Sequence, residues 1–431
     1  MKIIEKINAL KNNASVMKYL KNTSWLLADN ALKLIVGLFI GAWVARHLGP
    51  NDFGIYSYAI SFVAIFGGVA TLGLDNIVVR ELVKREDSKG EILATTFALK
   101  LIGSVVALLL LFVGILISDM SDEVKAIAFI MGFTFLFQTS NVIKLHFQSV
   151  VESKYFVMAN IISITISAIV KIVLIISNSP LIDFAKVFLF DSFTLSLFLI
   201  YFYFKKTTLQ RTAYFVNKTL AKEMLKDSWP LIFAAIASVI KLKLGQVMLG
   251  NLGSFEDVGY YAAALRISEL WFLIPVLLGS SIYPALISAR KEGSGILRTR
   301  VLMITKAMLA FAIPFAMIVS LISEFLMTLL FGDEFKEAGH YLSLQIWSGL
   351  PYVVLFAYSQ ITYIEGKTKI HLYLSILSIG SIAYFNYWLI PLFGGIGAVY
   401  ASLITALLGT VLMIVLVEKD IKIFTKGTKY V

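Results

Sequence analysis

Charged side chains interrupt several long apolar stretches of this chain, and these residues are the best candidates for chemistry. Asp29 and Lys33 are four residues apart, so on a helix they would share one face and could pair. Arg266 and Glu269, three apart, would also lie side by side. A guanidinium keeps its charge when buried and binds phosphate through two hydrogen bonds, which makes Arg266 the strongest candidate for an anion site. The alternative in each case is an ion pair that only holds helices together.

Other charges near the ends of apolar stretches also have two interpretations. Asp75 and Arg80 would form a gate at the inner end of a helix, or simply mark its end. Lys100 is retained as a candidate ligand contact. Three further lysines lie within about two turns of a stretch end, and we expect their long side chains to reach the aqueous boundary: Lys171, Lys186 and Lys306.

The sequence carries no motif for catalysis. Its four histidines are isolated, and it contains neither an HExxH zinc motif nor a P-loop for ATP. The absence of cysteine excludes disulfides, thiolate metal sites and cysteine nucleophiles. We therefore expect no enzyme, no metal site and no cofactor, so that any transport step would use a proton or sodium gradient or consumption of its product.

The composition indicates a lipid environment. Hydrophobic residues make up 58% of the chain and charged residues 15%, whereas soluble domains carry roughly 25% charged residues. The net charge of +11 does not indicate nucleic acid, because no stretch is long enough to be a basic soluble domain. A helix of about 20 apolar residues crosses the hydrocarbon core. We expect an all-α integral membrane protein with about 12 transmembrane helices, near residues 24–45, 54–75, 92–117, 125–143, 156–177, 183–204, 228–250, 258–287, 303–331, 341–364, 371–391 and 396–417.

The loop charges predict how the chain is threaded, because lysine and arginine accumulate on the cytoplasmic side. Among the 38 such residues, only Arg46 and Lys336 fall in the loops opposite the N-terminus, so both termini are expected in the cytoplasm. The expected divisions are a basic tail or membrane-surface helix without a cleavage site (1–23), a six-helix bundle (24–204), a basic connector (205–227), a second six-helix bundle (228–417) and a cytoplasmic tail (418–431).

An internal repeat supports two bundles. Gly54-x-Tyr56 follows the first exterior turn, and Gly259-x-Tyr261 follows the turn six predicted helices later. An even number of helices gives both copies one orientation, which predicts parallel repeats about an axis along the membrane normal, with a substrate site between them. Chance similarity of two turns is the alternative. The same alignment sets Lys241 opposite Gly37, and directs the neighbouring Lys243 elsewhere.

Several turn motifs resemble one transporter family over essentially the whole chain. They are Arg46-His-Leu-Gly-Pro-Asn-Asp-Phe-Gly-Ile-Tyr56, Leu72-Gly-Leu-Asp-Asn76 with Arg80-Glu81, Val258-Gly-Tyr-Tyr-Ala-Ala263 with Arg266, Phe331-Gly-Asp-Glu-Phe335 and Gly394-Gly-Ile-Gly-Ala398. The sequence is similar to polysaccharide exporters of the MOP (MATE-like) superfamily, and within it to O-antigen flippases of the Wzx type. These motifs are strong signatures of the superfamily and weak ones of its cargo.

The resemblance implies a flippase in the bacterial inner membrane. Its cargo would be an undecaprenyl-diphosphate-linked oligosaccharide, moved from the cytoplasmic to the periplasmic leaflet by alternating access. Its partners would be membrane lipids and the polysaccharide polymerase and chain-length machinery. The predicted roles are substrate binding for Arg266, Lys241, Lys33 and Lys100, and ion coupling or gating for Asp29, Glu269, Asp75 and Arg80. A cation-exporting multidrug transporter, a lipid II flippase and a sugar-joining membrane enzyme are the alternatives.

Overall fold

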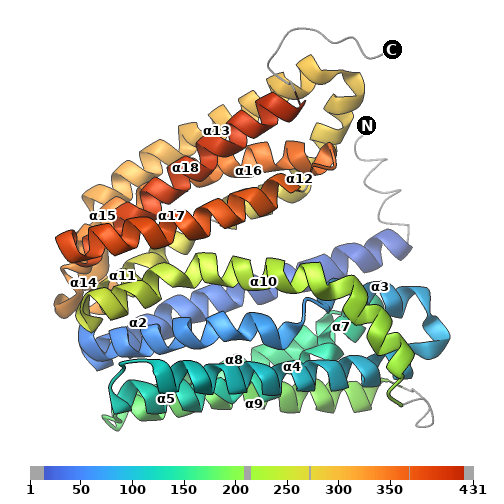
Figure 1. The fold of residues 1–431 in the computed structure, drawn as a ribbon, viewed down its shortest axis with the longest axis horizontal. Coiled ribbons are helices and arrows are strands. Elements are labelled where there is room, and N and C mark those ends of the chain that lie inside the picture. Colours follow the sequence, from blue (N-terminus) through green and yellow to red (C-terminus); the bar gives the residue numbers. More distant parts are fainter. Residues whose placement is uncertain (1–13, 208–214, 271–272, 368, 422–431) are drawn as a thin grey trace. The chain divides into compact units, whose positions relative to one another are not determined.

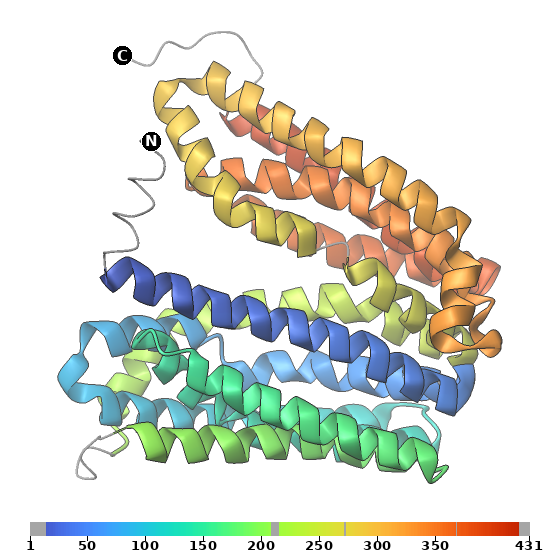
Figure 2. The same ribbon diagram turned by 180° about the vertical axis from the view of Figure 1, so that it is seen from behind.

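The computed structural model describes residues 14–207, 215–270, 273–367 and 369–421, and every regular element among these residues is helical (Figures 1 and 2). The first half of the chain forms α2 (Ala14–Thr71), α3 (Asp75–Lys84), the 3-10 helix η1 (Glu86–Ser88), α4 (Lys89–Ile117), α5 (Asp122–Gly132), α6 (Thr134–Gln138), α7 (Asn141–Ser149), α8 (Lys154–Ile176) and α9 (Leu181–Lys206). The expected all-α class is confirmed.

The second half of the chain repeats this pattern of long helices joined by short turns. It forms α10 (Lys218–Leu252), α11 (Phe255–Leu270), α12 (Leu273–Glu292), α13 (Ser294–Leu321), α14 (Ser323–Phe331), the 3-10 helix η3 (Asp333–Phe335), α15 (Ala338–Gln345), the 3-10 helix η4 (Ile346–Ser348), α16 (Gly349–Ile364), α17 (Lys369–Phe393) and α18 (Gly395–Ile421). The helix α10 begins ten residues before the expected second bundle, so the end of the expected connector is helical. Residues 1–13 of the predicted N-terminal surface helix lie outside the described residues. Residues 14–23 form the first part of α2.

Within the described residues, nine helical stretches are long and apolar enough to cross a membrane. The first, Lys21–Lys84, contains two expected spans, because α2 is broken at Gly49, where φ is +71°. The chain is therefore a multi-pass membrane protein. The count of 12 spans and the cytoplasmic placement of both termini stay predictions.

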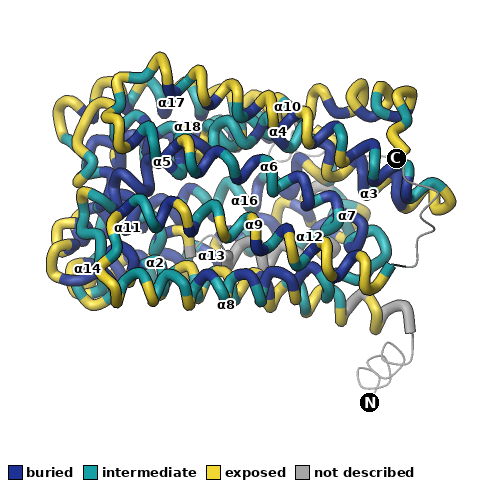
Figure 3. The backbone as a smooth tube through the Cα atoms, turned by 90° about the horizontal axis from the view of Figure 1, so that it is seen from below, coloured by how far each residue is buried: buried dark blue, intermediate teal, exposed yellow. Residues whose placement is uncertain are grey.

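Each long helix has a buried face and an exposed apolar face (Figure 3). On α4, Ile102, Leu109 and Leu116 recur every seven residues and are about 60% exposed. The opposite face of α4 is buried and includes Lys100 and Ser104. Large apolar side chains on an outer surface are stable against lipid but not against water, so the exposed face is the lipid-facing one.

The helices divide into two compact units. Unit 1 comprises residues 1–44 and 62–239, and unit 2 comprises residues 45–61 and 240–431. The boundaries lie inside α2 and α10, so these two helices contribute to both units. The division into one bundle at 24–204 and a second at 228–417 follows the order of the helices along the chain. It stays a prediction.

The two halves of the chain share one order and spacing of helices. The first residue of α13, Ser294, comes 205 positions after the first residue of α4, Lys89 (294 − 89). The first residue of α17, Lys369, comes 215 positions after that of α8, Lys154 (369 − 154). The ten-residue difference arises in the turn that contains α14 and η3. Positions in the two halves can therefore be compared directly.

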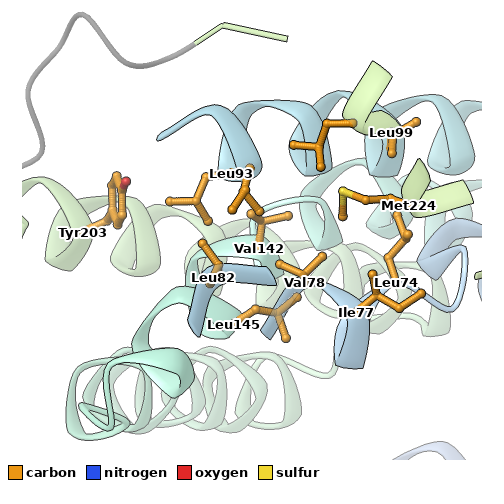
Figure 4. Close-up of a cluster of buried hydrophobic side chains, with 12 residues drawn as sticks. Leu74, Ile77, Val78, Leu82, Leu93, Leu99, Val142, Leu145, Tyr203 and Met224 are labelled. Carbon is orange, nitrogen blue, oxygen red and sulfur yellow. The ribbon is translucent and has the colours of Figure 1, made fainter. Parts of the chain in front are cut away.

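A hydrophobic cluster fixes one end of unit 1 (Figure 4). Buried side chains from α3, α4, α7, α9 and α10 meet there, among them Leu99, Leu145 and Met224. The break between α2 and α3 aids this packing, because Gly73 has φ +59° and a Cβ added there would lie 2.7 Å from the Leu231 carbonyl carbon of α10. Lys100 directly follows Leu99 in the sequence, and Lys144 directly precedes Leu145. The packing of these two leucines therefore fixes the positions of both lysines.

Candidate functional site

The predicted pairing of Asp29 and Lys33 on α2 is present. The Lys33 ammonium lies 2.7 Å from Asp29 Oδ2, and the Asp29 side chain is buried. The side-chain amide of Asn160, on α8, also donates to both Asp29 oxygens at 3.0 and 3.2 Å. The buried carboxylate of Asp29 therefore has both a cation and an amide donor as partners.

Lys100 forms an ion pair with Asp75 across two helices. Its ammonium lies 2.6 Å from Asp75 Oδ1, with the Lys100 side chain 4% exposed and the Asp75 side chain 56% exposed. Arg80 takes part in a separate group, where it contacts Asp227 on α10 at 2.7 Å and Glu81 at 2.9 Å. Asp75 and Arg80, predicted together as a gate, therefore have different partners.

A cavity of about 60 Å³ opens beside the Lys100–Asp75 pair within unit 1. Most of its lining residues are of polar types, and they come from α2, α3, α4, α6 and α7: Ala70, Thr71, Asp75, Lys100, Ser104, Gln138, Thr139, Asn141, Lys144 and Leu145. Lys144 interacts electrostatically with Lys100 and Asp75, and also with the Asp29–Lys33 pair. We call Asp29, Lys33, Asp75, Lys100 and Lys144 the charge cluster. It combines three cations with two anions inside a membrane-embedded unit.

Sequence reasoning missed Lys144 as a site residue. The expected span ended at position 143, which assigned Lys144 to a cytoplasmic loop, whereas α7 continues to Ser149. A usable signal was present, since Gln138, Asn141 and Lys144 recur every three residues and would share a helix face.

Two lysines of the charge cluster, Lys100 and Lys144, correspond to uncharged residues in the second half of the chain. Shifted by 205 positions, Lys100 corresponds to Thr305, which is buried and bonds the Val301 carbonyl of its own helix at 2.9 Å. Shifted by 215 positions, Lys144 corresponds to Ser359, whose hydroxyl bonds the Phe356 carbonyl. Because the same helical plan is built there without these lysines, the fold itself does not require them.

Two lysines predicted to reach the aqueous boundary are exposed, and one is not. Lys186 is 60% exposed beside Asp183, and Lys306 is also exposed. The prediction for Lys171 stays untested, but its surroundings differ from those of the other two. Its side chain is only 18% exposed and forms an ion pair with Asp191 of α9 at 2.8 Å.

The predicted residues of unit 2 lie on α10 and α11. The Arg266 guanidinium carbon is 5.3 Å from the centre of the buried Phe53 ring, a cation–π contact. Lys241 and Glu269 are exposed, and Lys243 is half-buried. The structure thus brings Lys33, Lys100, Asp29 and Asp75 together in unit 1, whereas Arg266, Lys241 and Glu269 belong to unit 2.

Residues 19–290 match the family described as "Polysaccharide biosynthesis protein", and residues 230–388 match the MatE family. The first match covers well over half of the chain. The chain belongs to the polysaccharide biosynthesis protein family. The relatives and structural neighbours described below are themselves named as transporters and flippases.

Individual relatives of this polysaccharide biosynthesis protein agree with the assignment. A protein of Shigella flexneri, proposed to be an O-antigen transporter, is 24% identical over 289 residues, which are 63% of this chain and 67% of the relative. The lipid II flippase MurJ, in an inward closed conformation, has a TM-score of 0.74 at 16% identity and covers 92% of this chain and 88% of its own. An inward-facing multidrug resistance MATE family transporter has a TM-score of 0.71 at 15% identity, covering 91% and 96%. These structures share the fold.

Proposed function

We propose that this protein is a flippase for an undecaprenyl-diphosphate-linked oligosaccharide, such as an O-antigen repeat unit. It would move this lipid-linked unit from the cytoplasmic to the periplasmic leaflet of the inner membrane by alternating access. Family membership and the relative from Shigella flexneri support the class of cargo. The observation that carries the proposal is the charge cluster, in which three lysines accompany two carboxylates and Lys100 is buried.

The physical need for such a cluster follows from the cargo. A diphosphate and several sugars cannot enter hydrocarbon without losing their hydration, and charged groups there cost several kcal/mol. Fixed cations inside a membrane-embedded unit replace part of that hydration with charge-assisted hydrogen bonds. Lys33 and Lys100 of unit 1 and Lys241 and Arg266 of unit 2 are the proposed contacts of the substrate.

The remaining predicted charges have a proposed part in coupling or gating. Asp29, held by Lys33 and Asn160, is a carboxylate that a gradient of protons or sodium ions could act on. Glu269 is the corresponding candidate in unit 2, while Asp75 and Arg80 are the proposed gating residues.

A multidrug exporter is the second candidate, since a MATE family transporter shares the fold. An exporter of cations needs carboxylates that are free to bind cations. In the charge cluster both carboxylates are paired, Asp29 with Lys33 and Asp75 with Lys100, which favours an anionic cargo. A lipid II flippase also has an anionic cargo, and the fold is shared with MurJ.

Deletion of the gene tests the proposal. We expect loss of cell-surface polysaccharide, with the lipid-linked unit accumulating in the cytoplasmic leaflet, and recovery of both on complementation with the wild-type chain. Normal surface polysaccharide in the deletion strain would reject this function. Loss of viability with accumulation of lipid II would instead identify the lipid II flippase, and increased drug sensitivity alone would identify the exporter.

A further inference from the structure

Three side chains that can donate hydrogen bonds line the unit 1 cavity from one side. Gln138, Asn141 and Lys144 are three residues apart along α6 and α7, and all face this cavity. Within the residues that the structure describes, none of the three side chains donates a hydrogen bond to the protein. Lys144 has one further contact, because its ammonium lies 5.5 Å from the centre of the Phe156 ring. Half-buried donors without hydrogen-bond partners in the protein require water or a ligand.

The other polar groups of the cavity leave an excess of donors over acceptors. The hydroxyls of Ser104 and Thr139 are committed to backbone carbonyls, at 2.8 and 2.7 Å. Lys100 faces the cavity from the buried side of α4, and its partner Asp75 is the one carboxylate in the lining. Two ammonium groups therefore share a single anion.

We infer that this cavity binds a phosphate group, and that Asp75 occupies the position of that group on Lys100 until a ligand displaces it. The inference deepens the proposed function and rests on it for the choice of phosphate, which is the group that joins lipid and glycan in the proposed cargo. Ammonium and amide donors on two sides of a small cavity match the several acceptor oxygens of a phosphate.

The geometry of Asp75 suits a displaceable anion. It follows a break in the helix where Leu72 and Gly73 both have positive φ, and its side chain is more than half exposed, whereas Lys100 is held on the buried face of α4. A second, wider cavity of about 240 Å³ shares Thr71 and Asp75 with the first. Asp75 thus stands between an open approach and the lysines.

The size of the inner cavity limits the ligand to a compact group. Its volume of about 60 Å³ exceeds the ~10–15 Å³ that one water molecule needs, but leaves no room for a sugar chain. The phosphate would enter the inner cavity, and the rest of a larger ligand would remain in the wider one. The uncharged Thr305 and Ser359 at the corresponding positions restrict this site to unit 1.

Binding to the purified full-length protein tests the inference. The protein is embedded in phosphatidylcholine nanodiscs and titrated calorimetrically with inorganic pyrophosphate at constant chloride. A parallel series adds phosphatidic acid to the nanodiscs and measures the rise in unfolding temperature. The variants are Lys144→Gln, which breaks no ion pair of the described residues, Asp75→Asn, and the control Lys171→Gln, which removes a lysine paired outside the cavity.

We expect Lys144→Gln to weaken binding about tenfold, Asp75→Asn to tighten it severalfold, and Lys171→Gln to leave it unchanged. If the variants rank in this order of affinity for pyrophosphate, a phosphate group that is free of lipid suffices for binding. If only phosphatidic acid gives this ranking of the variants, the bound phosphate group must belong to a lipid.

The inference is overturned if neither probe binds, if Lys171→Gln weakens binding as much as Lys144→Gln, or if folded Asp75→Asn binds no tighter. Should Asp75→Asn fail to fold, the comparison of Lys144→Gln with Lys171→Gln decides. If the binding test fails while deletion of the gene still abolishes surface polysaccharide, the phosphate site is rejected and the proposed function is retained.

Discussion

Gly54 and Gly259, the two glycines of the repeated Gly-x-Tyr motif, pack against each other's helices in unit 2. A Cβ added to Gly54 would lie 1.7 Å from the Phe255 carbonyl oxygen, and one added to Gly259 would lie 2.0 Å from the Pro50 carbonyl oxygen. Each glycine thus meets the residue four positions before the other. This reciprocity is the local two-fold relation that parallel repeats produce, and it leaves no room for a Cβ at either position.

Replacing Gly259 with alanine should therefore damage the protein severely. Backbone atoms cannot move aside as a flexible side chain can, so we expect Gly259→Ala to cost about 3 kcal/mol or more of folding free energy. Thermal unfolding in detergent measures the loss. The matched control is Gly380→Ala, where an added Cβ meets nothing within 4 Å, and which should unfold as the wild type does. Equal unfolding temperatures for both variants would refute this packing.

Much of the fold was predictable because membrane helices are read from continuous apolar stretches. The Asp29–Lys33 pair was also predictable, since both residues lie within one helix turn of each other. The Lys100–Asp75 pair was not, because it joins residues 25 positions apart on different helices. Spacing rules describe contacts within a helix only. For the same reason the partner of Lys171, on the next helix, was missed.

Glu81 should be important for the stability of one end of unit 1. It is buried on α3 and accepts from Arg80 at 2.9 Å and from Arg85 at 3.1 Å, and these arginines also contact Asp227 and Glu223 of α10. Glu81→Ala would leave two half-exposed guanidinium groups without their shared anion. We expect it to lower the folding free energy by about 1–3 kcal/mol.

The control for Glu81 is its exposed neighbour in the same group. Asp227→Asn removes one surface contact of Arg80, and exposed ion pairs contribute roughly 0–1 kcal/mol. Thermal unfolding of the two variants in one detergent should separate them clearly. A loss with Asp227→Asn as large as with Glu81→Ala would mean that the contact with α10, rather than the buried carboxylate, holds this end together.

Asp29→Asn should uncouple transport from its energy source while preserving the fold. Asparagine has the same shape and still accepts a hydrogen bond from Asn160, but it cannot be charged. We expect transport in proteoliposomes to become insensitive to an imposed proton or sodium gradient. Asn160→Ala, which keeps the carboxylate, should retain the gradient dependence. An Asp29→Asn protein that still responds to the gradient would exclude Asp29 as the coupling residue.

Arg266 should be required for export because its charge is fixed in unit 2 by the Phe53 ring. Arg266→Ala is expected to abolish surface polysaccharide in a complemented deletion strain, while Arg266→Lys, which keeps the charge but loses the planar two-bond geometry, should restore part of it. Phe53→Leu is the matched control, since it removes the ring 5.3 Å from the guanidinium and leaves the cation. We expect this variant to lose stability and retain export.

These three variants separate a substrate contact from a structural one. If Arg266 only stabilises the helices through the ring, then Arg266→Ala and Phe53→Leu remove the same contact and should have the same effect on export. If it binds the cargo, export should follow the charge at position 266 and be independent of the ring. Normal export by an Arg266→Ala protein inserted at wild-type levels would therefore reduce Arg266 to a packing residue, and the substrate contacts would then have to come from other cations such as Lys33 and Lys100.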